Sequence, residues 1–259
     1  MFADKMLTTA IPERVLTLCK IVKSSKNGHI SYAELKGKME PDFLGNKSSY
    51  FADYYTAAQE LGLIGDFDGA VSLIVDPKVV ESSNSLRKYA NTRLSNFRDG
   101  QFFNVTKAYF DLGESVFELE KNVAQWKPVF ASVGVHAEAD DLRAWRFWFS
   151  FLGLGYMHDM FPIPNANVFL KDAIENAGLK KGGRYSSGEF VDAIQPYSEI
   201  IINPTSRSFN YGTSCGLRAL HDLGFITLEH ILDQDDIWGL YPMELHSIGS
   251  TVTNVTING

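Results

Sequence analysis

Cysteine is nearly absent from this chain. Among 259 residues there are two, Cys19 and Cys215, which lie far apart and in no paired-ligand spacing. A disulfide framework needs several cysteines in close order, so the class of small disulfide-bonded secreted proteins is excluded. Reduced thiols are typical of intracellular proteins, and we therefore expect the chain to work in the cytoplasm.

Long apolar runs are also missing. The most hydrophobic stretch, FWFSFLGLGY at 147–156, has about half the length that a membrane-spanning helix needs, and Arg143 and Arg146 stand just before it. The first residues, MFADKMLTTAIPERVL, contain no continuous apolar core behind a basic start, so no secretory signal is expected. We therefore expect no membrane partner.

Positive charge is scarce. The chain has 24 Lys and Arg against 31 Asp and Glu, a formal charge of −7. Residues 1–80 hold nine cationic and ten acidic side chains, residues 81–139 hold seven of each, and residues 140–259 hold eight against fourteen. Sequence-independent binding to nucleic acid requires Lys and Arg to replace phosphate counterions, so the whole chain is not built for it. In the C-terminal part, a wing tip with Asp233, Asp235 and Asp236 favours a protein partner.

No strong catalytic or phosphate-binding motif is present. The glycine-rich stretch KKGGRYSSG at 180–188 lacks the residue order of a phosphate loop. Cys215 and His221 would lie on nearly opposite faces of one helix, so they cannot form a nucleophile–base pair. The His-Asp dipeptides at 158–159 and 221–222 offer ligands for a divalent cation, but they need not converge. We expect no catalytic residue, no metal site and no cofactor, and the chain is not predicted to be an enzyme.

The first eighty residues alternate between helix signals and turn signals. Residues 12–25 begin with proline and repeat apolar positions at helical spacing. Ser31, with Glu34 three residues later, predicts a capping box at the start of a second helix. A third helix is expected from Lys47 until Gly62 ends it; Leu63 and Ile64 then start an extended segment, and the turn GDFDG separates it from a returning strand. Three helices followed by strand–turn–strand resemble the winged helix-turn-helix superfamily over residues 12–76.

The end of the third helix recurs twice along the chain. The letters LGLI at 61–64 return as LGLGY at 152–156 and as LGFI at 223–226, each time after a helical run with an apolar face. Glycine adopts positive φ readily, which lets a helix turn directly into a strand. We predict a mainly α protein with small β wings, built from tandem winged helix-turn-helix domains joined by a helical linker. The predicted parts are a winged-helix domain at 1–80, a helical linker with a central winged-helix-like unit at 81–166, and a second winged-helix domain at 167–259.

Several details of these parts follow from the pattern. The linker is expected to carry helices over LRKYANTRLSNFRD and ESVFELEKNVAQW, with QFFNVTKAYFDLG between them. In the last unit, helices over VFLKDAIENAGL, SSGEFVDAIQPY and SRSFNYGTSCGLRALHDLG are expected before a strand pair within ITLEHILDQDDIWGLYPM. The central unit is either a winged helix or a helical hairpin that shares the LG corner. The aromatic segment with Trp145 and Trp148 is expected to form core.

The predicted linker helix concentrates cations and is the first candidate for DNA contact. With aromatic residues interleaved, these cations are Arg87, Lys88, Arg93 and Arg98. One interpretation is a helix that contacts phosphates beside the first domain. The alternative is a solvated helix face, which is the usual role of a run of charges.

Two further groups are weaker candidates for binding anions. Asn46, Lys47 and Ser48 begin the presumed recognition helix, where short polar side chains can reach base edges; an ordinary capped helix fits equally well. The second anion-binding candidate lies in the glycine-rich connection and consists of Lys180, Lys181 and Arg184.

The N-terminal letters IPERVL and the central W-x-x-x-LGLG…PIPN segment carry a further resemblance. Together they resemble DpdG-type accessory winged-helix proteins of prokaryotic genome-defence clusters, which are found with systems that install modified deazaguanine in DNA. This resemblance implies a non-catalytic adaptor or scaffold that works with DNA-handling enzymes. The expected partners are therefore other proteins of a complex, with DNA as a second candidate through the N-terminal half. The alternative is a sequence-specific transcription regulator, which would form a homodimer on a palindromic site.

Overall fold

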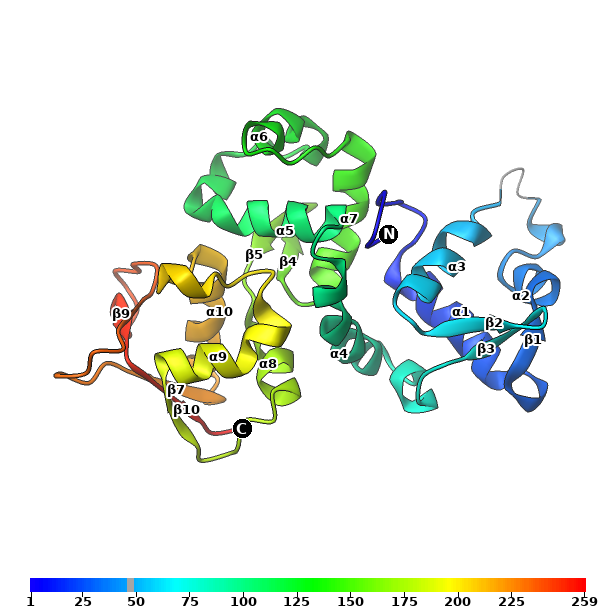
Figure 1. Ribbon diagram of the computed structural model, residues 1–259. Coiled ribbons are helices and arrows are strands. Elements are labelled where there is room, and N and C mark those ends of the chain that lie inside the picture. Colours follow the sequence, from blue (N-terminus) through cyan, green and yellow to red (C-terminus); the bar gives the residue numbers. More distant parts are fainter. Residues whose placement is uncertain (46–48) are drawn as a thin grey trace.

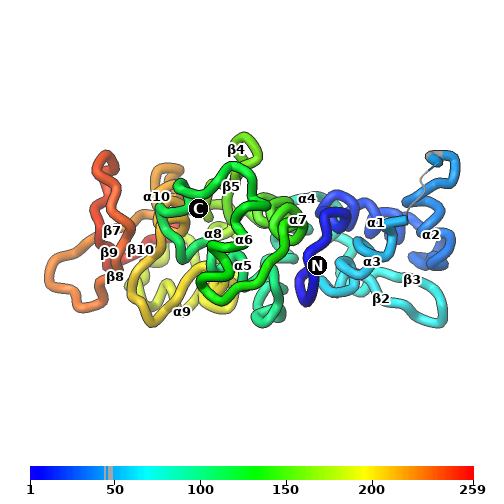
Figure 2. Tube along the Cα trace, turned by 90° about the horizontal axis from the view of Figure 1, so that it is seen from above, coloured from blue at the N-terminus to red at the C-terminus, as the bar shows by residue number. Residues whose placement is uncertain are grey.

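The molecule is an elongated row of three groups of elements that keep the order of the sequence (Figure 1). In the computed structural model, which describes residues 1–45 and 49–259, residues 1–80 lie at one end, 81–166 in the middle and 167–259 at the other end. The view from above shows the same order (Figure 2). We call these groups the N-terminal, central and C-terminal segments. About 51% of the chain is helical and the sheets are small, which confirms the class of mainly α with small β elements.

The N-terminal segment packs three helices against a small antiparallel sheet. Its elements are α1 (Pro12–Ser24), β1 (His29–Ser31), α2 (Tyr32–Met39), α3 (Phe51–Glu60), β2 (Ile64–Phe67) and β3 (Ala70–Leu73). The last strand lies in the middle, so the sheet order is β1-β3-β2. Ser31 caps α2 as predicted, because its Oγ accepts the N–H of Glu34 at 3.2 Å. The carboxylate of Glu34, however, pairs with Lys38 (2.9 Å), so the expected capping box is only half formed.

The C-terminal segment repeats this connectivity. Its elements are α8 (Asn167–Asn176), β6 (Arg184–Ser186), α9 (Ser187–Ser198), α10 (Tyr211–Asp222), β7 (Ile226–Glu229) and β10 (Asn254–Ile257). The last strand again lies in the middle, in the order β6-β10-β7. Here a capping box is complete, since Ser186 and Glu189 each accept a hydrogen bond from the backbone N–H of the other.

The strand that completes this second sheet is not the one we predicted. The segment ITLEHILDQDDIWGLYPM contains β7, but β7 pairs with β10, and residues 230–253 form an insertion between them. Within the insertion, β8 (Trp238–Gly239) pairs with β9 (Thr251–Val252). The physical reason is burial: Val255 and Ile257 of β10 lie opposite Leu228 and Ile226, and all four are buried, whereas DQDD offers no apolar side chain for that face.

The central segment consists of helices and one hairpin. Its elements are α4 (Ser83–Arg93), α5 (Gln101–Asp111), α6 (Lys127–Ser132), α7 (Ala139–Phe151), β4 (Gly155–His158) and β5 (Phe161–Pro164). The stretch QFFNVTKAYFDLG, expected only as a connection, is helix α5, because Phe102, Val105 and Tyr109 bury one face at helical spacing. The predicted helix over ESVFELEKNVAQW is wrong, and that stretch forms two short 3₁₀ turns.

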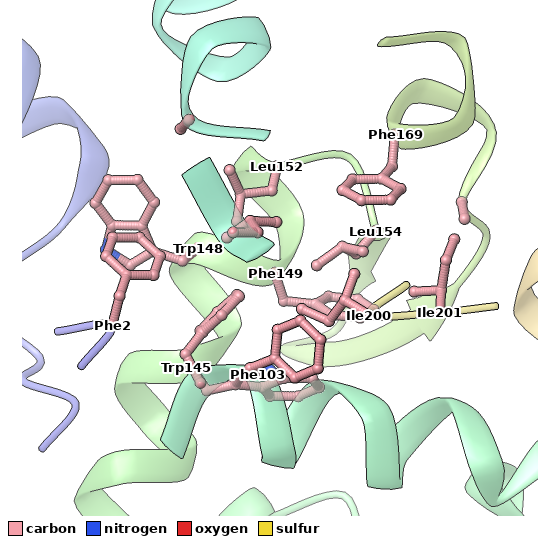
Figure 3. Close-up of a cluster of buried hydrophobic side chains, with 14 of the residues drawn as sticks. Phe2, Phe103, Trp145, Trp148, Phe149, Leu152, Leu154, Phe169, Ile200 and Ile201 are labelled. Carbon is pink, nitrogen blue, oxygen red and sulfur yellow. The ribbon is translucent and has the colours of Figure 1, made fainter. Parts of the chain in front are cut away.

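Aromatic side chains fill the core of the central segment (Figure 3). Trp145 and Trp148 of α7 are fully buried, as predicted. The Trp145 ring lies 4.6 Å from that of Phe149, while the Trp148 ring lies 4.7 Å from that of Phe2. The same buried cluster continues through Phe169 into the C-terminal segment, so one core runs through all three parts of the molecule.

The three LG corners share one backbone geometry. Gly62, Gly153 and Gly224 have φ of 67°, 77° and 70°, and each lies between a helix and a strand. The residue after each glycine donates its N–H to the carbonyl five positions back: Leu63 to Ala58 (2.9 Å), Leu154 to Phe149 (3.2 Å) and Phe225 to Leu220 (2.9 Å). These bonds satisfy carbonyls that a helix end would leave free, and they confirm the predicted helix-to-strand corner.

The corners differ in their surroundings, which allows a test. At Gly153 an added Cβ would lie 2.6 Å from the Cβ of Val168, whereas at Gly224 nothing lies within 4 Å. We expect Gly224→Ala to destabilise by about 1–2 kcal/mol through positive φ alone. Gly153→Ala should cost about 2–5 kcal/mol, because the steric clash is added. Urea unfolding of both variants measures the difference, and equal losses would contradict the close packing at Gly153.

Candidate interaction surfaces

Arg87, the first residue of the predicted cationic cluster, forms an ion pair with the buried carboxylate of Asp172 on α8. Arg87 on α4 donates to Asp172 from Nε (2.8 Å) and from Nη2 (3.1 Å). Asn91, one turn further on α4, donates to the same carboxylate (2.9 Å) and to the carbonyl of Leu152 at the end of α7 (3.2 Å). Asp172 is 1% exposed, so the guanidinium of Arg87 forms an ion pair within the molecule.

The remaining cations of the cluster also face protein. Lys88 pairs with Glu175 of α8, and Arg98 pairs with Glu199 at the end of α9, both at 2.5 Å. Arg93 reaches the other way and lies against Gly62 at the corner of the N-terminal segment. The cluster therefore joins the central segment to both neighbours, and carboxylates of the C-terminal segment pair with three of its four cations, Arg87, Lys88 and Arg98.

The third helix and hairpin of the N-terminal segment carry no Lys or Arg over 51–60 and 64–73. The predicted contacts Asn46, Lys47 and Ser48 lie outside the described residues, and α3 begins after them at Phe51. The exposed face of α3 consists of Ala52, Thr56 and Gln59. With Asp66 near the tip of the following hairpin and Asp68 in its turn, this surface is neutral to acidic, which disfavours contact with a phosphate backbone.

In the C-terminal segment, the corresponding helix α10 is covered on two sides. On one side an added Cβ at Gly212 would lie 2.6 Å from the ring of Phe110 on α5. On the other side the insertion lies against it, and the guanidinium of Arg218, 2% exposed, donates to the carbonyls of Tyr241 (2.7 Å) and Gly249 (2.9 Å). Ser214 Oγ accepts the N–H of Tyr241 at 2.8 Å. Helix α10 cannot enter a DNA groove without losing these contacts.

The second anion-binding candidate is partly neutralised. Arg184 on β6 pairs with Glu229 on β7 across the sheet at 3.0 Å. Lys180 and Lys181 are exposed in the preceding turn. These three side chains therefore do not gather around one enclosed site.

The acidic residues of the predicted wing tip lie in the insertion. Asp236 accepts the N–H of Gly188 in the first turn of α9 at 2.6 Å. Burial alone would raise the pKa of Asp236, but this bond, together with the polar side chains of Ser186 and Trp238 nearby, lowers it overall. Asp233 and Asp235 are exposed. Asp236 thus stabilises a helix N-terminus, so only two of the three acids are exposed to a partner.

The His and Cys residues serve separate local contacts. His221 Nδ1 accepts the N–H of Leu228 (3.2 Å), while Asp222 lies against His246 Nε2 (3.1 Å). His158 lies 3.8 Å from its neighbour Asp159. Within residues 1–45 and 49–259, no three His, Cys, Asp or Glu side chains are grouped so that they could hold a metal ion. No helix in the same ranges has the length and hydrophobicity to cross a membrane.

A hollow on the outside of α7 was missed by the sequence analysis. Phe147 is 42% exposed there, and Met160, in the turn of the β4–β5 hairpin, is 60% exposed. Arg146, Phe151 and Met157 also line this hollow of about 240 Å³. The signal was present, because Arg143, Phe147 and Phe151 are spaced four apart, on a different face from the buried Trp145 and Trp148.

Comparison of the chain with models of protein families, with curated proteins and with solved structures found no match. Its function must therefore be inferred from the surfaces described above.

The buried contact at Asp172 can be tested by substitution. Asp172→Asn removes the charge that Arg87 faces, and breaking a buried pair in this way should cost about 2–4 kcal/mol. The matched control is Glu175→Gln, which removes the partner of Lys88 in a more exposed pair and should cost about 1 kcal/mol or less. Urea unfolding measures both, and equal small losses would show that the Asp172 contact does not hold the segments together.

The two thiols are expected to react slowly. Burial raises the pKa of Cys19 to about 12, so at pH 8 only about one thiol in 10⁴ is ionised. In a Cys215→Ser variant, the remaining Cys19 should resist alkylation until urea unfolds the protein. A thiol-reactive dye at pH 8 checks this, and rapid labelling of the native variant would contradict the buried position of Cys19.

Proposed function

We propose that the protein is a non-catalytic adaptor built from tandem winged helix-turn-helix units. The proposal of winged-helix units is supported by the order helix–strand–helix–helix–strand–strand, which occurs in both terminal segments with the last strand in the middle of the sheet. The central segment supplies helices and a two-stranded hairpin between them. In this proposal the winged-helix units form a rigid row that holds partner proteins.

One observation carries the choice of adaptor over DNA reader. The surfaces with which such units would contact DNA offer few free cations: α10 is covered on two sides, α3 and its hairpin carry no Lys or Arg, and Arg87, Lys88 and Arg98 are paired with carboxylates. A DNA reader needs cations free to meet phosphates. Exposed apolar side chains such as Phe147 and Met160 suit contacts with protein instead.

The wider context of the proposal rests on resemblance. The segments IPERVL and W-x-x-x-LGLG…PIPN resemble DpdG-type accessory proteins, which favours a role beside DNA-handling enzymes of a prokaryotic defence system. Such a complex works in the cytoplasm, in agreement with the scarcity of cysteine. Under this proposal the catalytic partners supply the contact with DNA.

DNA binding and oligomeric state test the adaptor against the regulator. We expect fluorescence anisotropy with a labelled 24-base-pair duplex to show binding weaker than about 10⁻⁵ M at physiological salt, with the protein monomeric in light scattering. Tight, steeply salt-dependent binding by a dimer would support the transcription regulator instead.

A pair of variants tests whether the cations are masked by their carboxylates. Glu175→Gln with Glu199→Gln frees Lys88 and Arg98 and should raise DNA affinity at low salt. Glu118→Gln with Glu120→Gln makes the same change of net charge at exposed positions and should raise it less. If both pairs raise the affinity equally, masking by the ion pairs is not the reason for weak binding.

A further inference from the structure

Helix α7 presents different chemistry on two of its faces. Trp145 and Trp148 are fully buried in the core, whereas Phe147 is 42% exposed. Phe151 is half-buried one turn further and packs edge-on against Trp148 at 5.5 Å. The outer face of α7 is therefore an apolar stripe. Because the inner face of the helix already packs into the core, the exposed apolar side chains of this stripe do not stabilise the fold.

The β4–β5 hairpin turns this stripe into a groove. Met157 of β4 and Met160 of the turn line a hollow of about 240 Å³ together with residues of α7, and Glu13 of α1 lines it as well. The hairpin projects from the row of segments (Figure 2), and Met160 in its turn is exposed. Methionine side chains adapt to partners of different shape, which suits a binding wall better than a fixed core.

The turn that presents Met160 has an unusual backbone. Asp159 has φ of 47° and Met160 has φ of 67°, a region that large side chains rarely adopt. Arg146 Nη1 donates to the carbonyl of Met160 at 2.7 Å and holds the turn in place. Strained residues of this kind persist where the position of the side chain matters, and here the outcome is an exposed methionine at the rim of the groove.

Arg146 is the only charged group of α7 that lines the groove, and the carboxylate of Glu13 on α1 lines the same hollow. Its Nε is buried and makes no hydrogen bond within the described part of the chain. Burial, and then the neighbouring Arg143, lower the pKa of Arg146. Glu13 forms no ion pair with it among the residues described. By contrast, Arg87 meets both oxygens of a carboxylate. A buried N–H donor without an acceptor, such as Nε of Arg146, is unfavourable, and a carboxylate would satisfy it.

We propose that this groove binds an acidic amphipathic helix of a partner protein. Its apolar face fills the hollow between Phe147, Phe151 and Met157, and one of its carboxylates meets Arg146. A helix fits because Arg146, Phe147, Ser150 and Phe151 form a ridge along α7 against which another helix can pack. A basic helix is disfavoured by the unpaired guanidinium. The inference rests on the proposed adaptor role and identifies the surface and the partner chemistry.

The probe is a phage library of random 16-residue peptides, selected against the wild-type protein and counter-selected against Phe147→Glu. Because Phe147 is exposed, this variant is expected to keep its fold, which thermal unfolding verifies. We expect the enriched peptides to combine apolar residues at helical spacing with an excess of Asp and Glu. Enrichment of basic peptides, binding unaffected by Phe147→Glu, or no enrichment would each overturn the proposal.

A matched pair of arginine variants then tests the charge contact with the best enriched peptide. Arg146→Gln should weaken its binding at least about tenfold, the usual scale for losing a charge-assisted hydrogen bond. Arg143→Gln removes the same charge from an exposed arginine that pairs with Asp140, and should change affinity less than about threefold. Equal effects would contradict a direct contact with Arg146.

Methyl NMR locates the peptide on the protein. Met157 and Met160 should shift on titration with the enriched peptide, while Met39 and Met243, which lie elsewhere, should not. Shifts confined to Met39 or Met243 would overturn the assignment to the groove. The DNA assay distinguishes the two levels of failure: a tight, dimeric DNA binder refutes the adaptor itself, whereas peptide failure with weak DNA binding refutes only the groove.

Discussion

The contact of Asp172 with Arg87 and Asn91 joins the central segment to the C-terminal segment, through the same helix that contacts the N-terminal segment. A carboxylate that is 1% exposed is tolerable only because α4 brings a guanidinium and an amide to it, and the same amide reaches the end of α7. Helix α4 also contacts the first corner, where Tyr89 donates to the carbonyl of Gly62. One short helix therefore fixes both neighbours, and the usual view of a charged linker as a flexible connection does not apply to it.

The two terminal segments share a connectivity but use it differently. In the N-terminal segment β3 follows β2 after the two-residue turn Asp68-Gly69, and the third helix remains open to solvent on one face. In the C-terminal segment residues 230–253 separate the corresponding strands, and this insertion covers α10. The same order of elements can thus leave a helix available to a partner or bury it, and in the C-terminal segment the long connection between the last two strands and helix α5 together cover the third helix.

Local signals in the sequence were sufficient for the corners and helix caps, but not for contacts between distant residues. Leu-Gly at the end of an amphipathic run predicts positive φ without knowledge of the rest of the chain, and Gly62, Gly153 and Gly224 confirm it. The partner of β7 could not be predicted, because β10 follows 25 residues after it and the acidic insertion intervenes. The cations Lys88 and Arg98 of the predicted linker helix look like a solvated face until Glu175 of α8 and Glu199 at the end of α9 meet them. The α7 groove was hidden because one aromatic run supplies both core and surface.

The cage around Arg218 links two parts of the sequence that must change together. Its guanidinium donates to carbonyls of Tyr241 and Gly249, so the insertion replaces the water that a cation on α10 would otherwise need. Without the insertion the arginine would be free to meet a phosphate, and without the arginine the carbonyls of the insertion would be unsatisfied. In the evolution of such proteins, arginine at this position and an insertion of this kind should be gained or lost together. In a related sequence, the presence of both would therefore predict a third helix that is covered by the insertion.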